Sequence, residues 1–314
     1  MTKSVSKHLL TGIGLILLFS SCFQKSIDKH GGIRMTLEIS GEDQQADAVE
    51  KTLSILENRL YVFSHRSLKT TYTSQNQVIA EIPLATDPDF FRNLATASGR
   101  LSVAESYVRP ESIGLTLPIT AKAKEMFPEM PVADRSVLVA FFNPDQSVSY
   151  LPIFGASLKG DTAFINNFLA RDSIRALFPE DLELIWGKEQ ENGLHPLYAK
   201  KKSGLANRVS AAGVEKAVAE VSRYTGQHEL SLNFRDKEGW RKLTAQNINR
   251  QILMIVSGTV MTAPTVQSEI PQGGALISGN FEEKEVRFLE AIIHFGPYPG
   301  KVFVKNIEVV TPPQ

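Results

Sequence analysis

Residues 229–262 read ELSLNFRDKEGWRKLTAQNINRQILMIVSGTVMT, and this stretch carries the clearest pattern of secondary structure in the chain. Leu230, Leu232 and Phe234 alternate with polar residues, which predicts a strand with one buried face. Gly258 follows an apolar run and predicts a tight hairpin turn. The stretch therefore predicts a strand over 230–234, a helix over 236–250, and two strands over 252–257 and 259–262.

A second helix and a last strand are expected after this stretch. The apolar positions of the helix recur every three or four residues, at Val286, Leu289, Ile292 and Ile293. Asn280 and Glu283 stand at its start, and Asn280 is expected to cap the free amides of the first turn. Apolar residues at Val302, Val304 and 307–310 predict the last strand.

The amino-terminal part of the chain repeats this order. Its expected elements are a strand over 32–40, a helix with apolar positions from Ala46 to Phe63, strands near 67–73 and 78–84, a helix that starts at Asp87 and Pro88 and stops at Gly99, and a strand through Leu101, Val103 and Tyr107. The order β-α-β-β-α-β thus occurs twice. It predicts an α+β fold of two ferredoxin-like units, with antiparallel sheets covered by helices.

The middle of the chain, residues 108–226, contains eight prolines and many glycines. A hairpin is expected there over 137–142 and 149–154, and a helix over 162–175. The three lysines within 200–204 are expected to lie in a solvated loop, with contact to anionic lipid as the alternative.

Composition and spacing exclude several classes of function. Lysine and arginine together number 34, as do aspartate and glutamate, so no excess of charge favours a nucleic acid. The six histidines are never three or four residues apart, which excludes the usual spacing of metal ligands. No G-x-S-x-G motif occurs. We therefore expect no enzymatic activity, no cofactor, no metal site and no small-molecule substrate.

The start of the chain has the pattern of an export signal. Two lysines precede an apolar run over 9–19, which two serines and Cys22 follow. A membrane-spanning helix needs roughly 20 residues, so the run predicts a signal peptide over 1–21, with a short membrane anchor as the alternative. Cys22 is the only cysteine, and its surroundings resemble the lipobox of bacterial lipoproteins. This resemblance implies lipidation of Cys22, a short tether over 22–27, and a domain held at the periplasmic side of the inner or the outer membrane.

Short motifs also occur in a fixed order along the expected elements. They are Asp28, Gly31 and Gly32 before the first strand, Arg59 in the first helix, Asn233 and Phe234, Asn247 with Arg250 and Gln251, Gly258 with Pro264, and Gly279, Asn280 and Phe281. In these residues and their spacing the chain resembles the first periplasmic domain of the bacterial export factor SecD. Its middle is similar to the enlarged SecDF form of the Bacteroidetes group.

The resemblance implies a base subdomain over 28–107 plus 299–314 and an inserted head subdomain over 108–298. The chain would cross between them at 107–110 and 296–300. We expect the motif residues to have structural roles and not to form a catalytic site: the glycines permit tight turns and Asn280 caps a helix.

In SecD the head and base move relative to each other, the head is considered to hold an emerging preprotein, and membrane helices shared with SecF couple proton flow to that motion. The resemblance therefore implies an accessory module that binds exported polypeptides or Sec translocon components, without a proton-coupled motor of its own. Phe141, Phe142 and Phe154 are candidate contacts with polypeptide, although some of them must be core. The alternative is an envelope lipoprotein that keeps the fold and serves another partner.

Overall fold

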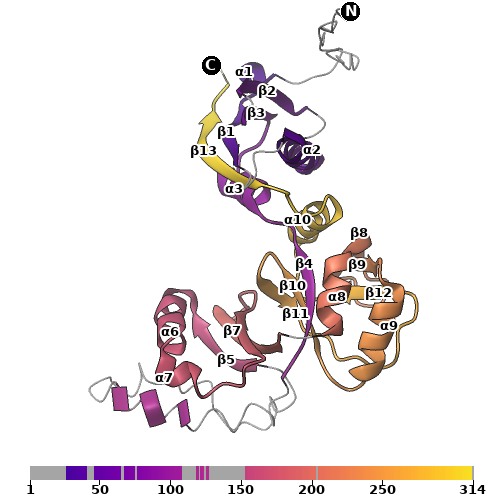
Figure 1. The fold of residues 1–314 in the computed structure, drawn as a ribbon. Helices are drawn as coiled ribbons and strands as arrows, with labels where there is room; N and C mark the ends of the chain where they lie inside the picture. Colours follow the sequence, from indigo (N-terminus) through magenta and orange to yellow (C-terminus); the bar gives the residue numbers. More distant parts are fainter. Residues whose placement is uncertain are drawn as a thin grey trace, which may run out of the picture.

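The computed structural model describes residues 26–40, 46–64, 67–74, 76–107, 118–119, 121–123, 125–126, 153–202 and 204–312. The expected signal peptide, Cys22, Phe141 and Phe142 lie outside these residues. Figure 1 shows three parts, which we call the base (26–96 and 301–312), the head (101–107 and 204–294) and the side lobe (153–202). Both ends of the described chain lie in the base.

The base is a four-stranded antiparallel sheet with the order β13–β1–β3–β2. Its strands are β1 (Gly32–Ser40), β2 (Lys69–Ser74), β3 (Gln77–Pro83) and β13 (Lys301–Val310), and its helices are α1 (Ile27–His30), α2 (Ala46–Val62) and α3 (Pro88–Thr96). Ile33, Met35 and Leu37 of β1 are fully buried, which confirms the alternation expected over 32–40. Leu56 of α2 and Leu94 of α3 belong to the same core. This strand order and helix placement make the base a ferredoxin-like unit.

The last strand of the base comes from the carboxyl end of the chain, because β13 pairs with β1 along its whole length. The strand expected through Leu101 and Val103, β4 (Leu101–Glu105), pairs with β10 (Ile252–Val256) of the head instead. The expectation that this strand completes the base sheet is therefore wrong. Both segments alternate apolar residues, and alternation does not say which of them pairs with β1.

The head contains two three-stranded antiparallel sheets, β11–β10–β4 and β12–β9–β8. The remaining strands are β8 (Val214–Val221), β9 (His228–Phe234), β11 (Thr259–Thr262) and β12 (Gly274–Ile277), and the helices are α8 (Leu205–Ala212), α9 (Lys237–Gln246) and α10 (Glu283–His294). The α+β class with antiparallel sheets and helices is confirmed, as is the order of the second set of elements. Its strands nevertheless fall in separate sheets, because β8 and β12 occupy both sides of β9.

The hairpin expected at Ser257 and Gly258 is confirmed. Both residues have positive φ, 51° and 85°, and Val256 pairs with Thr259 directly across the turn. These angles suit the two-residue turns whose twist matches that of the flanking strands. The helix expected over 236–250 ends earlier, since α9 stops at Gln246.

The side lobe is a third sheet, β5–β7–β6, with two short helices. Its elements are β5 (Ile153–Leu158), α6 (Thr162–Leu169), α7 (Asp172–Arg175), β6 (Leu182–Trp186) and β7 (Leu194–Lys201). The single helix expected over 162–175 is interrupted at 170–171. Lys200 and Lys201 lie in β7 and not in a loop, and Lys200 pairs with Glu183 of the neighbouring strand at 3.0 Å.

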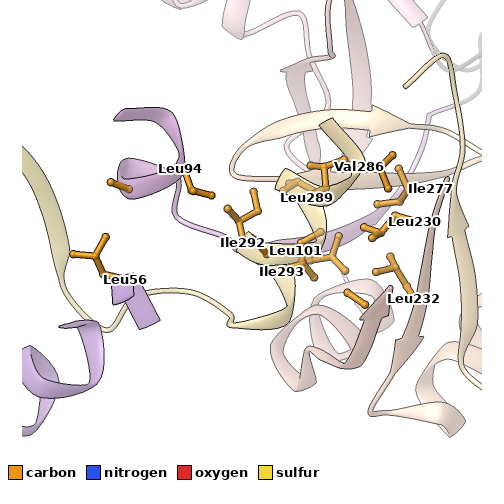
Figure 2. Close-up of a cluster of buried hydrophobic side chains, with 14 of the residues drawn as sticks. Leu56, Leu94, Leu101, Leu230, Leu232, Ile277, Val286, Leu289, Ile292 and Ile293 are labelled. Carbon is orange, nitrogen blue, oxygen red and sulfur yellow. The ribbon is translucent and has the colours of Figure 1, made fainter. Parts of the chain in front are cut away.

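One hydrophobic core runs from the base into the head. Figure 2 shows Leu56 and Leu94 of the base, the apolar side of α10, and the buried face of the β12–β9–β8 sheet along one line of side chains. The α10 side chains in this core are Val286, Leu289, Ile292 and Ile293, as its periodicity predicted. The side lobe has a core of its own. Base and head therefore share α10 as a packing element.

A buried arginine joins the base to the two segments that connect it with the head. Arg59 of α2 is 0% exposed. Its guanidinium donates hydrogen bonds to four backbone carbonyls, those of Ala97 at 2.5 Å, Ser98 at 3.3 Å, Ile292 at 3.2 Å and Gly296 at 2.6 Å. The first two carbonyls follow α3, and the other two lie at the end of α10. One side chain of the base thus holds both connections, and we call this arrangement the clasp.

The clasp has a direct physical cause. The last carbonyls of a helix lack partners within the helix and carry the negative end of its dipole, so a cation with several donors stabilises them. Arginine supplies five N–H groups in a rigid fork. The Tyr298 ring lies 4.1 Å from the guanidinium carbon and adds a cation–π contact. Burial lowers the pKa of Arg59, and the interaction with Tyr298 opposes that lowering.

Gly99 makes room for the clasp. A Cβ atom on this residue would lie 2.2 Å from both Arg59 Nη2 and the Ile292 carbonyl oxygen, and φ is +69°. Gly226 has nearly the same φ, +71°, but a Cβ atom there would meet no other atom within 4 Å. The two glycines therefore differ in steric surroundings and not in backbone conformation.

We expect Gly99→Ala to destabilise the protein more than Gly226→Ala. Both alanines carry the left-handed backbone penalty of about 1–2 kcal/mol. Only the alanine at position 99 would clash with atoms of the clasp. This overpacking should lower the unfolding free energy by about 1–3 kcal/mol more. Urea titration of both variants measures the difference in unfolding free energy. Equal losses would contradict the role of the clasp.

Tyr298 should make stability fall as pH rises above 10. Burial raises the pKa of its hydroxyl to about 12, whereas an unfolded tyrosine loses its proton near pH 10, at roughly the ordinary value. Between these values the unfolded state binds fewer protons, so stability is lost as pH increases. The Tyr298→Phe variant has no hydroxyl proton to lose. The native protein should therefore lose roughly 2–3 kcal/mol of unfolding free energy relative to this variant from pH 10 to 12. Parallel stability profiles in urea would contradict this assignment.

Candidate functional site

A groove with a volume of about 760 Å³ opens beside the clasp. Its walls come from α3 of the base, from α10, and from the hairpin of β10 and β11 in the head. Lys188 of the side lobe closes one part of the rim. The groove therefore lies where all three parts of the molecule meet.

Apolar side chains line most of the groove. They are Phe90, Ala97, Val256, Met261, Phe281, Phe288, Leu289 and Ile292. Phe90 and Phe288 meet edge to face, with ring centroids 5.8 Å apart, and Phe63 packs on Phe90 at 4.9 Å. Aromatic contacts between α3, α10 and the end of α2 thus hold this wall in place.

The two lysines at the rim are paired with carboxylates. Lys284 binds Asp87 at 2.6 Å and lies 4.2 Å from the centre of the Phe90 ring. Lys188 binds Glu285 at 2.9 Å and lies 4.3 Å from the Phe281 ring. The hydrogen bond from Lys284 holds the pKa of Asp87 below its usual range, with help from the Phe90 backbone N–H that Asp87 caps. The rim consequently has no strong excess of either charge.

The motif residues found in the sequence divide between scaffold and junction. Those in the base are Asp28, Gly31 and Gly32, those in the interior or turns of the head are Asn233, Phe234, Asn247, Arg250, Gln251 and Pro264, and those at the junction are Arg59, Gly258, Gly279, Asn280 and Phe281. The head residues support its core. Phe234 stacks on Trp240 at 4.5 Å, and the Asn247 side chain reaches Glu105 of β4 at 3.3 Å.

Three motif residues line cavities at the junction. Phe281 lines the groove, and Gly279 and Asn280 join it in lining a smaller cavity of about 290 Å³ next to the groove. Asn280 does not cap α10 as expected, because its side chain donates to Glu191 of the side lobe at 2.7 Å. The first turn is closed instead by Glu285, whose carboxylate accepts from the Glu282 backbone N–H.

The candidate polypeptide contacts Phe141 and Phe142 lie outside the described residues. Phe154 is 5% exposed and packs edge to face on Phe178 in the side-lobe core. It offers no binding surface in this structure. The alternating pattern of the strand had already indicated that some of these phenylalanines would be core.

The groove residues Phe90, Met261 and Phe288 were not found from the sequence. They occupy apolar positions on helices and a strand, where a core role is the ordinary interpretation. Only their partial exposure at the junction of three elements separates them from core residues. That information requires the tertiary structure.

Two other kinds of feature are absent from the described ranges. Within those ranges, no group of three or more histidine, cysteine, aspartate and glutamate side chains is placed to hold a metal ion. No helix in the described part of the chain is both long and apolar enough to cross a membrane.

Comparison with known proteins identifies relatives of this arrangement. Residues 190–299 match the family model of the SecDF P1 head subdomain. The protein translocase subunit SecD of Rhodothermus marinus is 24% identical over 307 residues, which cover 86% of this chain and 47% of that protein. SecDF of Thermus thermophilus is 23% identical over 289 residues, covering 91% of this chain and 31% of that protein. The chain thus spans about half or less of the length of these relatives.

Two further similarities complete the comparison. SecD of Acidaminococcus fermentans is 37% identical over 100 residues, or 31% of this chain and 23% of that protein. A crystal structure of SecDF in its super-membrane-facing form matches 91% of this chain and 32% of its own, with 18% identity and a TM-score of 0.48. In sequence the chain therefore resembles SecD and SecDF over most of its length, and its residues 190–299 are similar to the SecDF P1 head subdomain.

Proposed function

We propose that this chain takes part in protein translocation by binding apolar segments of unfolded, exported polypeptides in the groove between base and head. The observation that carries the proposal is the lining of the groove, where the partly exposed Phe90, Met261 and Phe288 gather beside Phe281. Exposed apolar patches of this kind mark binding surfaces. Unfolded chains present the apolar side chains that such a surface buries.

The composition of the groove favours a ligand of variable sequence. Met261 is flexible and polarizable, and methionine is common in surfaces that accept many partners. The rim lysines are already paired with carboxylates, so the groove does not select strongly for charge. Binding then depends mainly on apolar burial, which is not directional.

The position of the groove supports a link between binding and movement. Its walls belong to α3 of the base and to the β10–β11 hairpin of the head. An occupant contacts both parts, so it binds more tightly to the base–head arrangement that fits it best. This role needs no proton-coupled step within these residues.

We also propose that lipid on Cys22 holds this module at the periplasmic face of a membrane, within reach of the Sec translocon. The support is the order of lysines, apolar run, serines and cysteine at the start of the chain. A lipid tether would keep the groove close to emerging polypeptides without fixing its orientation.

We expect Met261→Glu to weaken binding of an unfolded protein at least tenfold, because a carboxylate in the groove would have to be desolvated. That factor corresponds to about 1.4 kcal/mol. Reduced, carboxymethylated lactalbumin is a suitable probe, and its affinity can be measured by fluorescence anisotropy. Leu276→Glu is the matched control, since Leu276 is a 39% exposed strand residue that does not line the groove. Equal affinities for the two variants would refute the groove as the binding site.

The same site can be tested in living cells. A photo-crosslinking amino acid at Thr259, which lines the groove, should capture exported polypeptides or Sec components. The same amino acid at Leu276 should capture markedly less. Capture of a different envelope protein, with export unchanged after deletion of this chain, would favour an interaction module that serves another partner.

We expect Cys22→Ala to abolish incorporation of labelled fatty acid and to release the protein from the membrane fraction. Mass spectrometry of the native amino terminus should find a diacylglyceryl group on the cysteine. A native protein that starts elsewhere, or that carries no lipid, would disprove the anchor while leaving the groove untouched.

A further inference from the structure

The edges of the two head sheets differ in how they are covered. Each three-stranded sheet has two edge strands, and an uncovered edge presents unpaired N–H and C=O groups to any extended chain. On β4, the Val103 N–H donates to Ser210 Oγ of α8 at 2.9 Å. On β11, the Val260 carbonyl accepts from the Lys188 N–H at 2.8 Å. Side-chain and main-chain groups of neighbouring elements therefore occupy these two edges.

The other sheet has one short edge and one long edge. β12 has only four residues, which is too short for extensive pairing. β8 has eight residues and pairs with β9 alone. Among the described residues, no main-chain group is bonded to the side of β8 that faces away from β9. β8 is thus the long head edge whose outward main-chain groups have no hydrogen-bond partner in the described chain, although α10 packs on one face of this strand.

The phase of the β8–β9 ladder determines which groups face outward. The Ser222 N–H donates to the Gln227 carbonyl at 2.8 Å, so the main-chain groups of Ser222 point toward β9. The Phe234 N–H donates away from β8, to Gly273 beside β12. In an antiparallel pair these directions alternate along the strand. The hydrogen bonds at both ends of the ladder therefore indicate the same phase. In this phase the N–H and C=O groups of Ala217, Ala219 and Val221 point away from β9.

The three residues whose main-chain groups point outward, Ala217, Ala219 and Val221, have small side chains. Ala217 is 2% exposed and belongs to the core, and Ala219 packs against the same core. Methyl groups form no pocket that would select particular side chains of an added strand. An extended chain would therefore be recognised by its main chain, which is the same in every sequence.

We propose that an extended segment of unfolded polypeptide adds to the free edge of β8 as a fourth strand of the β12–β9–β8 sheet. This inference rests on the proposed function and deepens it, because it names a main-chain mode of binding besides the apolar groove. The edge offers room for a strand of roughly 27 Å, from eight residues at about 3.4 Å each. Lys216 and Glu220 lie on the exposed face of β8 and carry opposite charges, so this face does not select a ligand of one charge.

Strand addition and groove binding act on the same helix. α10 packs its Val286, Leu289 and Ile293 against the sheet that contains β8, and it lines the groove with Phe288. Figure 2 shows these apolar side chains of α10 next to Leu230, Leu232 and Ile277 of that sheet. A polypeptide bound at either place therefore contacts an element that the base and the head share.

Hydrogen exchange measured by NMR on the full chain tests this proposal. In the free protein, the amides of Ala217, Ala219 and Val221 should exchange rapidly, whereas those of Val218 and Glu220, bonded to β9, should be protected. Saturation with reduced, carboxymethylated lactalbumin should slow exchange of the three outward amides at least tenfold. Protection already present in the free monomer, or no change at saturation, would overturn the proposal.

The Met261→Glu variant separates the two binding modes. Slowed exchange at β8 in both the native protein and this variant would support strand addition even if the groove proposal failed. Binding that Met261→Glu abolishes, with β8 amides unchanged in the native complex, would leave the groove standing and refute strand addition. Protection of β8 that depends on protein concentration, with a doubled mass by light scattering, would assign the edge to a second copy of this chain instead.

Discussion

The structure depends on the burial of one positive charge. Arg59 comes from the base, yet the carbonyls that it satisfies belong to the ends of α3 and α10. Burying a guanidinium is costly unless its donors are used, and leaving terminal helix carbonyls unpaired is also costly. When α2, α3 and α10 converge at one point, the two terminal nitrogens of Arg59 satisfy these carbonyls and offset most of both costs, while its Nε is left without a partner. The groove exists because this convergence keeps α3 and α10 together, and the β10–β11 hairpin completes its wall.

The clasp also lies where the packing of the base continues into the packing of the head. The main core continues through α10, and the two chain connections run past the same guanidinium. The same helix therefore sets the wall of the groove relative to both parts, because α10 packs on the β12–β9–β8 sheet while carbonyls at its end accept from Arg59.

Patterns within a single element could be predicted from the sequence, and pairings between distant elements could not. The buried face of 32–40, the turn at Ser257 and Gly258, and the apolar stripe of α10 follow from local periodicity and turn chemistry. The partners of β4 and β9 depend on which of several similar strands is nearest in space. The role of Asn280 could not be predicted for the same reason, since its partner Glu191 comes from the side lobe. The groove residues have the same apolar character as core residues, and only the junction leaves them partly exposed.

A protein that binds many unfolded sequences can rely only on what those sequences share, namely apolar side chains and the main chain. In the proposed modes of binding, the groove would bury the apolar side chains through contacts that need no direction, and the β8 edge would bind the main chain through hydrogen bonds that need no side chain. The covered edges strengthen this view. Ser210 and Lys188 occupy the edges of β4 and β11, where an uncovered strand would invite unwanted pairing. In the same head, the eight-residue edge of β8 has no such partner and lies next to a helix that also lines the groove. This contrast favours a binding role for the β8 edge.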